Sequence, residues 1–219
     1  MSLEEIVSLA RARGLNGAAV CDHDLALIDP PQFEDFLLIP GVEVSTQLGH
    51  LLGLFVTGPV EARDFFEAVD VIHRQGGLAV LAHPFQRRRD GGHILPIVQL
   101  LDGLEVWNSR ADRKNRRANE MAETFAGEHG LRPFAGSDAH VSREVGNGAL
   151  QVEAEALTLE AVKAALMEGK GQVLRRVESR AWYTAKSQLN KLRRTGAGPM
   201  AYGKWAAFAG KCLVRDMLR

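Results

Sequence analysis

Short apolar runs alternate with segments of helical spacing through the first 175 residues, and this alternation limits the fold more than any other feature of the chain. The apolar runs are rich in Val, Ile, Leu and Phe and occupy residues 16–22, 36–46, 50–56, 78–83, 103–108 and 132–136. Helical spacing is found over residues 61–75, 94–101, 111–129 and 158–169 and after the capping-box pair Ser2 and Glu5. Strands alternating with helices predict parallel βαβ units in an α/β fold.

The composition indicates a globular protein without a membrane span. Of the 219 residues, 46% are hydrophobic and 6% aromatic, which is ordinary for an α/β protein. No apolar run approaches the roughly 18 residues needed to cross a bilayer, and the first residues show no basic region followed by an apolar one. Cys21 and Cys212 lie far apart without a C-x-x-C partner, as in a reducing compartment. A cytoplasmic location is therefore expected.

Six residues of the kinds that bind metal ions stand where apolar runs meet loops. They are His23, Glu43, His50, His83, Asp138 and His140. Side chains at the ends of parallel strands converge on one mouth of an α/β barrel, so we expect a metal site assembled from several strands. Glu43, His50 and His83 together supply one carboxylate and two imidazoles, which leave an open position on a Zn, Mn or Fe ion, as in catalytic sites.

Other polar groups near these runs have two interpretations each. Asp138 and His140 either point to the barrel mouth or form an Asx-turn with an exposed histidine. Arg87, Arg88 and Arg89 follow His83 closely, so their guanidinium groups either bind phosphate or belong to a solubilising loop. The basic residues Arg113, Lys114, Arg116 and Arg117 predict a solvated helix face.

Four strings in order carry a family resemblance: VCDHD (20–24), IPGVEVSTQLGHLLGL (39–54), GGLAVLAHPF (76–85) and FAGSDAH (134–140). They resemble the PHP family, named for polymerase and histidinol phosphatase, over about residues 2 to 175. The resemblance implies a distorted (β/α)7-type barrel that hydrolyses a phosphate ester with up to three divalent metal ions. Glu43, His83 and Asp138 would be catalytic.

The resemblance also distributes the ligands among three metal sites. Glu43, His50 and His83 would form the second site, which is complete here, with Glu43 bridging to the first. Asp138 would belong to the first site, and His23 with His140 to the third. Asn108, in the string GLEVWN, would lie near the substrate, although a strand-end polar pair with Glu105 is an equal interpretation.

One departure from the family pattern concerns the start of the chain. PHP chains begin with a strand carrying H-x-H, whereas this chain begins at MSLEEIVSLARARGL, which predicts the helix after that strand. We therefore expect a barrel without its first strand, weak first and third metal sites and impaired hydrolysis, with the native strand encoded upstream. The alternative function is a non-catalytic PHP-like binding or regulatory module.

The last part of the chain is a basic helical tail. Residues 175–219 contain eleven basic and two acidic residues, although the whole chain has no net charge. This shift predicts a phosphoesterase domain over 1–175 and a tail over 176–219, with helices at 182–194 and about 200–218. Trp182, Tyr183, Tyr202 and Trp205 could stack on bases, which slightly favours nucleotide or short oligonucleotide substrates over other phosphorylated small molecules. Docking on the barrel, a homodimer contact and a membrane surface are the other roles considered for the tail.

Overall fold

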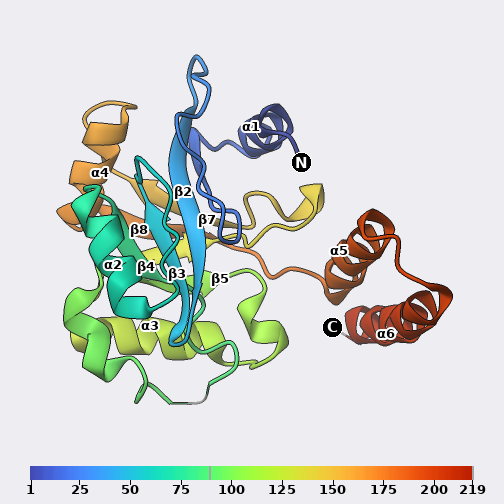
Figure 1. The fold of residues 1–219 in the computed structure, drawn as a ribbon. Helices are drawn as coiled ribbons and strands as arrows, with labels where there is room; N and C mark the ends of the chain where they lie inside the picture. Colours follow the sequence, from blue (N-terminus) through green and yellow to red (C-terminus); the bar gives the residue numbers. More distant parts are fainter. Residues whose placement is uncertain (89, 219) are drawn as a thin grey trace.

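The computed structural model describes residues 1–88 and 90–218 and shows a mixed α/β fold whose main sheet curls into a half-barrel (Figure 1). Six strands follow one another across this sheet in chain order: β1 Gly17–Val20, β2 Leu37–Thr46, β3 Gly49–Leu54, β4 Leu78–Leu81, β5 Gly103–Asn108 and β6 Pro133–Gly136. A second sheet consists of β7 Gly148–Val152 and β8 Gly171–Arg176.

The helices lie close to where the sequence predicts them. The α-helices of the body are α1 Leu3–Arg11, α2 Phe65–Arg74, α3 Ala118–His129 and α4 Leu159–Met167. Short 3-10 turns are η1 Leu95–Leu100, η2 Ala111–Arg113 and η3 Ser142–Glu144. Ser2 caps α1 by accepting a hydrogen bond from the backbone N–H of Glu5, and Thr158 caps α4 in the same way. Gly130 ends α3 in the left-handed conformation.

The sheet is not wholly parallel, so the prediction of parallel βαβ units is wrong in part. β1 with β2, β4 with β5, and β5 with β6 pair in parallel, but β3 runs antiparallel to both β2 and β4. Only Gln47 and Leu48 connect β2 to β3, and a connection of that length permits a hairpin but no crossover. The apolar run 36–56 is therefore one hairpin.

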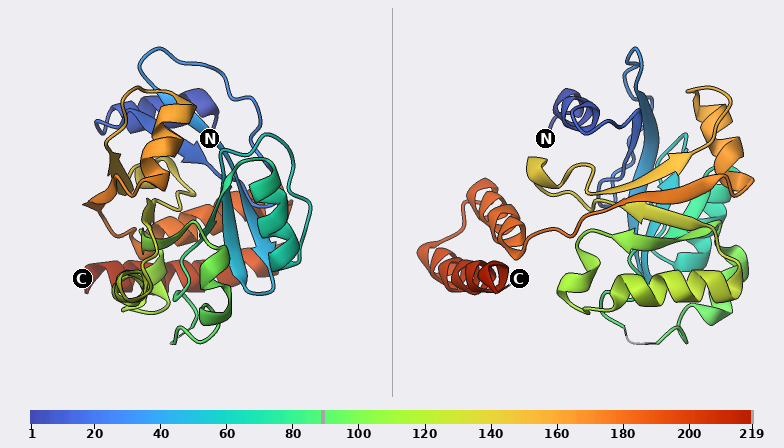
Figure 2. Two further views of the ribbon diagram at one scale, coloured as in Figure 1. Left: turned by 90° about the vertical axis from the view of Figure 1, so that its left-hand side faces the viewer. Right: turned by 180° about the vertical axis from the view of Figure 1, so that it is seen from behind.

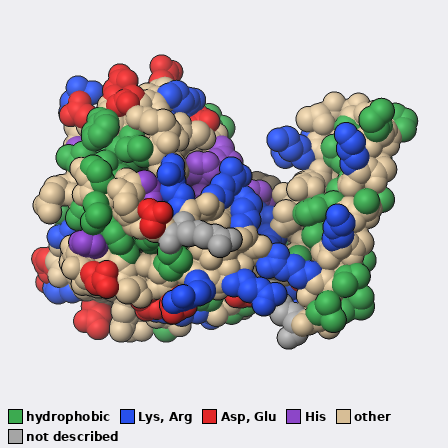
Figure 3. All heavy atoms as spheres, turned by 90° about the horizontal axis from the view of Figure 1, so that it is seen from below, with side chains coloured by type: hydrophobic (Ala, Val, Ile, Leu, Met, Phe, Trp, Pro, Cys, Tyr) green, Lys and Arg blue, Asp and Glu red, His purple; other side chains and the backbone are tan. Residues whose placement is uncertain are grey.

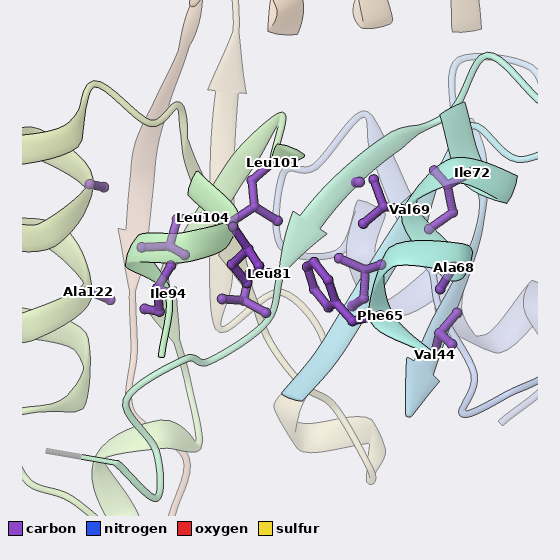
Figure 4. Packing of buried hydrophobic residues seen from close by; sticks show 14 of the residues in the cluster. Val44, Phe65, Ala68, Val69, Ile72, Leu81, Ile94, Leu101, Leu104 and Ala122 are labelled. Carbon is purple, nitrogen blue, oxygen red and sulfur yellow. The ribbon is translucent and has the colours of Figure 1, made fainter. Parts of the chain in front are cut away.

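Alternation along the strands separates two apolar layers and places the site. Val42 and Val44 of β2 pack with Phe65 and Ile72 of α2 in the larger core, part of which is shown in Figure 4. On the other face of the sheet, Leu54, Val80 and Phe134 pack with Val162 and Leu166 of α4. Successive side chains of a strand point to opposite faces. Glu43, between Val42 and Val44, therefore points away from the larger core and toward the inside of the half-barrel.

Two glycines allow β6, β7 and the end of β5 to approach closely. A Cβ atom on Gly148 would collide with the carbonyl oxygen of Gly136, and one on Gly136 would collide with the carboxylate of Glu105. Gly148→Ala should therefore lower the free energy of unfolding by about 1–3 kcal/mol, measured by urea denaturation. Gly127→Ala is the control, because it faces open space within α3 and should stabilise by about 0.5–1 kcal/mol. Equal effects would contradict the close packing.

The tail is a pair of helices, α5 Ala181–Arg194 and α6 Pro199–Met217, that stands apart from the body in the front and back views (Figures 1 and 2). Its small core consists of Ala181, Ala185, Ala209 and Cys212 with Trp182, Trp205 and Phe208 around them. Trp182 and Trp205 are thus used in helix pairing rather than standing free to stack on bases. No helix in the described part of the chain is both long and apolar enough to cross a membrane.

The two tail helices are also joined at their ends. Asp216 of α6 accepts hydrogen bonds from the backbone N–H groups of Ala181 and Trp182 at 2.8 and 2.9 Å. It thereby caps the first turn of α5 from another helix, where a negative charge is favourable. Leu213 and Leu218, near the end of the tail, are exposed.

Candidate metal centre

Glu43 lies at the centre of three imidazole rings. Its Oε1 is 2.6 Å from Nδ1 of His50 and 3.3 Å from Nε2 of His83, and its Oε2 is 3.4 Å from Nδ1 of His23. The rings of His23 and His50, and those of His50 and His83, meet edge to face at 5.1 and 5.0 Å between centroids. Four of the six predicted ligands therefore share one place.

Strand register explains why these side chains meet. His50 is paired with Ser45 across the β2–β3 hairpin, and Glu43 is two residues before Ser45, so Glu43 and His50 are diagonal neighbours on one face. His23 forms an isolated parallel bridge with Glu43 just beyond the end of β1. His83 follows β4 by two residues. Four adjacent strands, β1 to β4, thus fix the cluster.

Electrostatics tie the cluster together further. Burial by itself raises the pKa of Glu43, but hydrogen bonds with His50 and His83 and the charge of His23 outweigh it and hold the pKa well below the usual range. Burial lowers the pKa of His83, but the hydrogen bond with Glu43 and the charges of Glu105 and Asp138 raise it to about 9. The carboxylate of Glu43 is therefore ionised, and its negative charge favours the protonated form of His83 beside it.

The donor set fits a transition-metal ion. One donor atom each from His23, Glu43 and His50 lies within 4.8 Å of the other two. Imidazole nitrogens with a carboxylate oxygen suit Zn, Mn or Fe, and fewer than a full set of protein ligands leaves room for water or substrate. His83 is a further imidazole beside this group, because its Nε2 is 3.3 Å from the same Glu43 oxygen that contacts His50.

Asp138 and His140 lie together in the loop after β6. His140 Nδ1 is 3.3 Å from a carboxylate oxygen of Asp138 and 2.9 Å from its carbonyl oxygen. Asp138 is near enough to the first cluster to raise the pKa of His83 by its charge. Both His83, with φ of 31°, and Asp138, with φ of 47°, have left-handed backbones. Non-glycine residues held in this region often mark functional sites.

Glu105 and Asn108 of β5 lie beside His83, and Glu105 is hydrogen-bonded to both His83 and Asn108. Glu105 is buried and accepts hydrogen bonds from the backbone N–H of His83 at 2.8 Å and from the Asn108 amide at 3.0 Å. Burial raises the pKa of Glu105 to about 7, with the charge of His83 opposing this shift. The carbonyl oxygen of the Asn108 side chain accepts from the backbone N–H of Arg110, so this amide helps to hold the loop, and its role toward substrate stays a prediction.

The arginine loop after His83 is held against the η2 turn. Asn115 donates its amide to the carbonyl oxygens of Phe85 and Arg88 at 3.0 and 3.3 Å, and Lys114 donates to Gln86 at 3.1 Å. The side chains of Arg87 and Arg88 are exposed, and Arg89 lies outside the described residues. Their binding of phosphate stays a prediction.

The expectation of a solvated helix face for Arg113, Lys114, Arg116 and Arg117 is wrong, because α3 begins only at Ala118. Lys114, Arg116 and Arg117 are exposed, but Arg113 is half-buried. Arg113 lies in η2 rather than in a helix face, donates to the carbonyl oxygen of Arg180, and accepts from Arg215 at its own carbonyl. Burial lowers the pKa of Arg113 to about 10, and the charge of Arg110 adds to this effect. Arg113 therefore connects the body to the tail.

A buried network that the sequence did not reveal supports the Asp138 loop. Glu144 is fully buried and accepts hydrogen bonds from the Ser179 hydroxyl and from the backbone N–H of His140. Arg110 places its Nε 3.4 Å from Glu144 and donates to the carbonyl oxygen of Asp138 at 3.4 Å. The network links residues far apart in the sequence, and buried polar groups of this kind carry no local pattern.

A cavity of about 1500 Å³ opens from the cluster into the half-barrel. His23, Glu43, His83, Asp138 and His140 line one part of it, and β1, β6 and the tail helix α5 contribute other walls. Seen from below, Lys and Arg side chains gather beside a group of histidines and continue toward the tail (Figure 3). The arrangement offers metal ligands, a cavity and nearby positive charge.

The comparisons with known proteins agree with this fold. Residues 116–170 match the family described as PHP-associated. The four motifs, the fold and this match support assignment of the chain to the PHP domain family.

Individual relatives extend the comparison. An uncharacterized protein of Methanocaldococcus jannaschii is 34% identical over 138 residues, which make up 59% of this chain and 54% of the relative, so the chain spans about half of that protein's length. Two crystal structures share the fold. One is PsfC from Pseudomonas syringae, with a TM-score of 0.63 and 13% identity over 87% of this chain and 88% of PsfC. The other, from Bacteroides vulgatus, is a two-domain protein containing a predicted PHP-like metal-dependent phosphoesterase, with a TM-score of 0.57 and 16% identity over 78% of this chain and 60% of that one.

Proposed function

We propose that the chain is a metal-dependent phosphoesterase whose substrate is a nucleotide or a short oligonucleotide. The observation that carries this proposal is the carboxylate of Glu43 among three imidazoles at the wall of a large cavity. The structural likeness to a protein with a predicted phosphoesterase supports the same general activity. The basic groups on the side of the cavity that leads to the tail favour an anionic substrate.

A divalent ion held here supplies two kinds of chemistry: it polarises a phosphoryl oxygen and lowers the pKa of water toward neutrality. His23, Glu43 and His50 would hold the ion, with His83 as a further ligand. Asp138 would hold a neighbouring ion or orient the substrate, and its left-handed backbone fixes the direction of its side chain. Arg87 and Arg88 would neutralise phosphate charge from the loop above.

We also infer that the half-barrel is a (β/α)7-type barrel short of one strand. Among the described residues, β1 pairs only with β2, so this edge of the sheet stays open, whereas β7 packs closely against the end of β6 at the other edge. The cavity lies between these edges, lined by Ala18 and Val20 on one side and by Phe134 and Ala135 on the other. An added strand there would supply further ligands, so the activity of this chain alone is expected to be low.

The activity is tested with p-nitrophenyl phosphate and a short oligonucleotide in the presence of Mn or Zn. Asp138→Asn and His83→Ala should each lower kcat/KM by about 100-fold or more, because each removes a side chain that would bind or orient the metal ion at the reacting phosphate. His73→Ala is the matched control: this histidine lies on α2, pairs with Asp102 and should leave the rate unchanged.

The outcome separates the two candidate functions. A wild-type chain that binds metal but hydrolyses neither compound, even with a peptide supplying the missing strand, would favour a non-catalytic binding or regulatory module. An ordinary enzymatic rate in the chain alone would contradict the idea that the open barrel edge impairs it.

A further inference from the structure

The tail helix α5 forms a wall of the same cavity as the metal cluster. Four of its residues, Ser187, Asn190, Arg193 and Arg194, line the cavity together with Asp138 and His140. Their spacing of three and four residues places Ser187, Asn190 and Arg194 along one side of the helix, with Arg193 at its margin. A polar stripe thus runs along α5 and ends in two guanidinium groups.

We propose that this stripe is a second part of the substrate site, which binds phosphates of a single-stranded oligonucleotide beyond the one at the metal cluster. The proposal rests on the proposed phosphoesterase function and names its substrate class. Arginine guanidinium groups match phosphate oxygens in a bidentate fashion, and the serine hydroxyl and asparagine amide donate hydrogen bonds to phosphate or sugar.

Hydrogen bonds fix the start of α5 next to the metal cluster. Arg110 bridges the two parts, since it donates to the carbonyl oxygen of Asp138 at 3.4 Å and to the hydroxyl of Thr184 at 3.3 Å. The backbone N–H of Ser179 donates to the carbonyl oxygen of Ser109 at 2.7 Å. Arg110 thus connects the loop that carries Asp138 to the first turn of α5, three residues before the stripe begins at Ser187.

The length of the stripe fits an extended polyanion better than a single phosphate. Arg194 follows Ser187 by seven residues, and a rise of 1.5 Å per residue gives about 10 Å along the helix. A phosphate group at the metal cluster cannot reach the far end of that distance. An oligonucleotide can, because its backbone repeats the charge along its length.

The positive charge of α5 also favours binding of a polyanion. Its sequence, AWYTAKSQLNKLRR, contains four basic residues and no acidic one. Arg193 and Arg194 line the cavity, whereas Lys186 and Lys191 are exposed and do not line it. Two cations of α5 therefore line the cavity and two do not, which makes a matched comparison possible.

Binding of a fluorescent single-stranded DNA of about ten nucleotides to the full chain, in EDTA so that it is not cleaved, tests the proposal. Arg193→Ala with Arg194→Ala should raise the Kd about tenfold at low salt and reduce the slope of log K against log salt by about 1.4, since two phosphate contacts are lost. Lys186→Ala with Lys191→Ala should change both quantities little. Hydrolysis of p-nitrophenyl phosphate should be unchanged in both variants.

Several other results would overturn the proposed role of the stripe on α5. Equal weakening by the two double variants would overturn the stripe in favour of general charge attraction, and so would no weakening by either. Loss of small-ester hydrolysis in the arginine variant would also overturn it, because the effect would then extend to the metal cluster. If the wild-type chain hydrolyses no ester but the arginine variant alone loses DNA binding, the phosphoesterase function fails and the stripe stands as a nucleic-acid site.

Discussion

Replacing Glu43 with glutamine should remove tightly bound metal from the protein. We expect the wild-type chain to retain about one transition-metal ion after dialysis, because one cluster has a carboxylate and three imidazoles in reach of each other. Glutamine keeps the size of the side chain but loses the charge that holds three imidazoles around it. The metal content of the Glu43→Gln protein, measured by elemental analysis, should fall to near zero.

A carboxylate outside the cluster provides the control for this measurement. Glu61→Gln changes an exposed carboxylate outside the cluster and should leave the metal content unchanged. Retention of the ion by Glu43→Gln would show that the histidines and Asp138 form a site without the carboxylate. Three firmly held ions in the wild type would contradict a single complete metal site at Glu43.

The second large effect concerns the buried Glu144. Glu144→Ala should lower the free energy of unfolding by about 3–5 kcal/mol, measured by urea denaturation, because it leaves the buried guanidinium of Arg110 without its carboxylate. It also removes the acceptor for the Ser179 hydroxyl and for the backbone N–H of His140. The Asp138 loop and the start of the tail should loosen together.

Two further variants show whether the charge pair is the cause. Glu123→Ala breaks the exposed ion pair with Arg176 and should cost no more than about 1 kcal/mol. Adding Arg110→Met to Glu144→Ala should recover part of the lost stability, because the unpaired charge is gone. A loss below about 1 kcal/mol in Glu144→Ala itself would mean that water reaches Arg110 and replaces the carboxylate.

The sequence predicts elements well where local signals agree. The string GLEVWN was predicted as a strand and forms β5 with the same bounds, and Ser2 and Thr158 cap the helices they were expected to begin. Strand β8, Gly171–Arg176, was not predicted, because its apolar residues alternate with glutamine and arginine and only pairing with β7 makes it a strand. The antiparallel direction of β3 could have been predicted from the two-residue connection between β2 and β3, which is too short for a parallel crossover.

In the candidate site, too, residues with a local sequence signal were predicted and long-range contacts were not. The sequence identified the side chains that surround Glu43, since each follows or lies within a short apolar run. It assigned His23 to a site with His140, whereas the structure also brings His23 to Glu43. It did not find the contact between Arg110 and Glu144, because a long-range ion pair depends on tertiary packing and has no spacing rule.

The left-handed backbones of His83 and Asp138 bear on any attempt to engineer this chain. Glycine adopts such φ values without a steric penalty, so a search for more stable variants would favour His83→Gly and Asp138→Gly. Both substitutions would erase a side chain that faces the cavity. Thermostabilisation of this scaffold should therefore hold these two positions fixed and seek its gains on the outer helices.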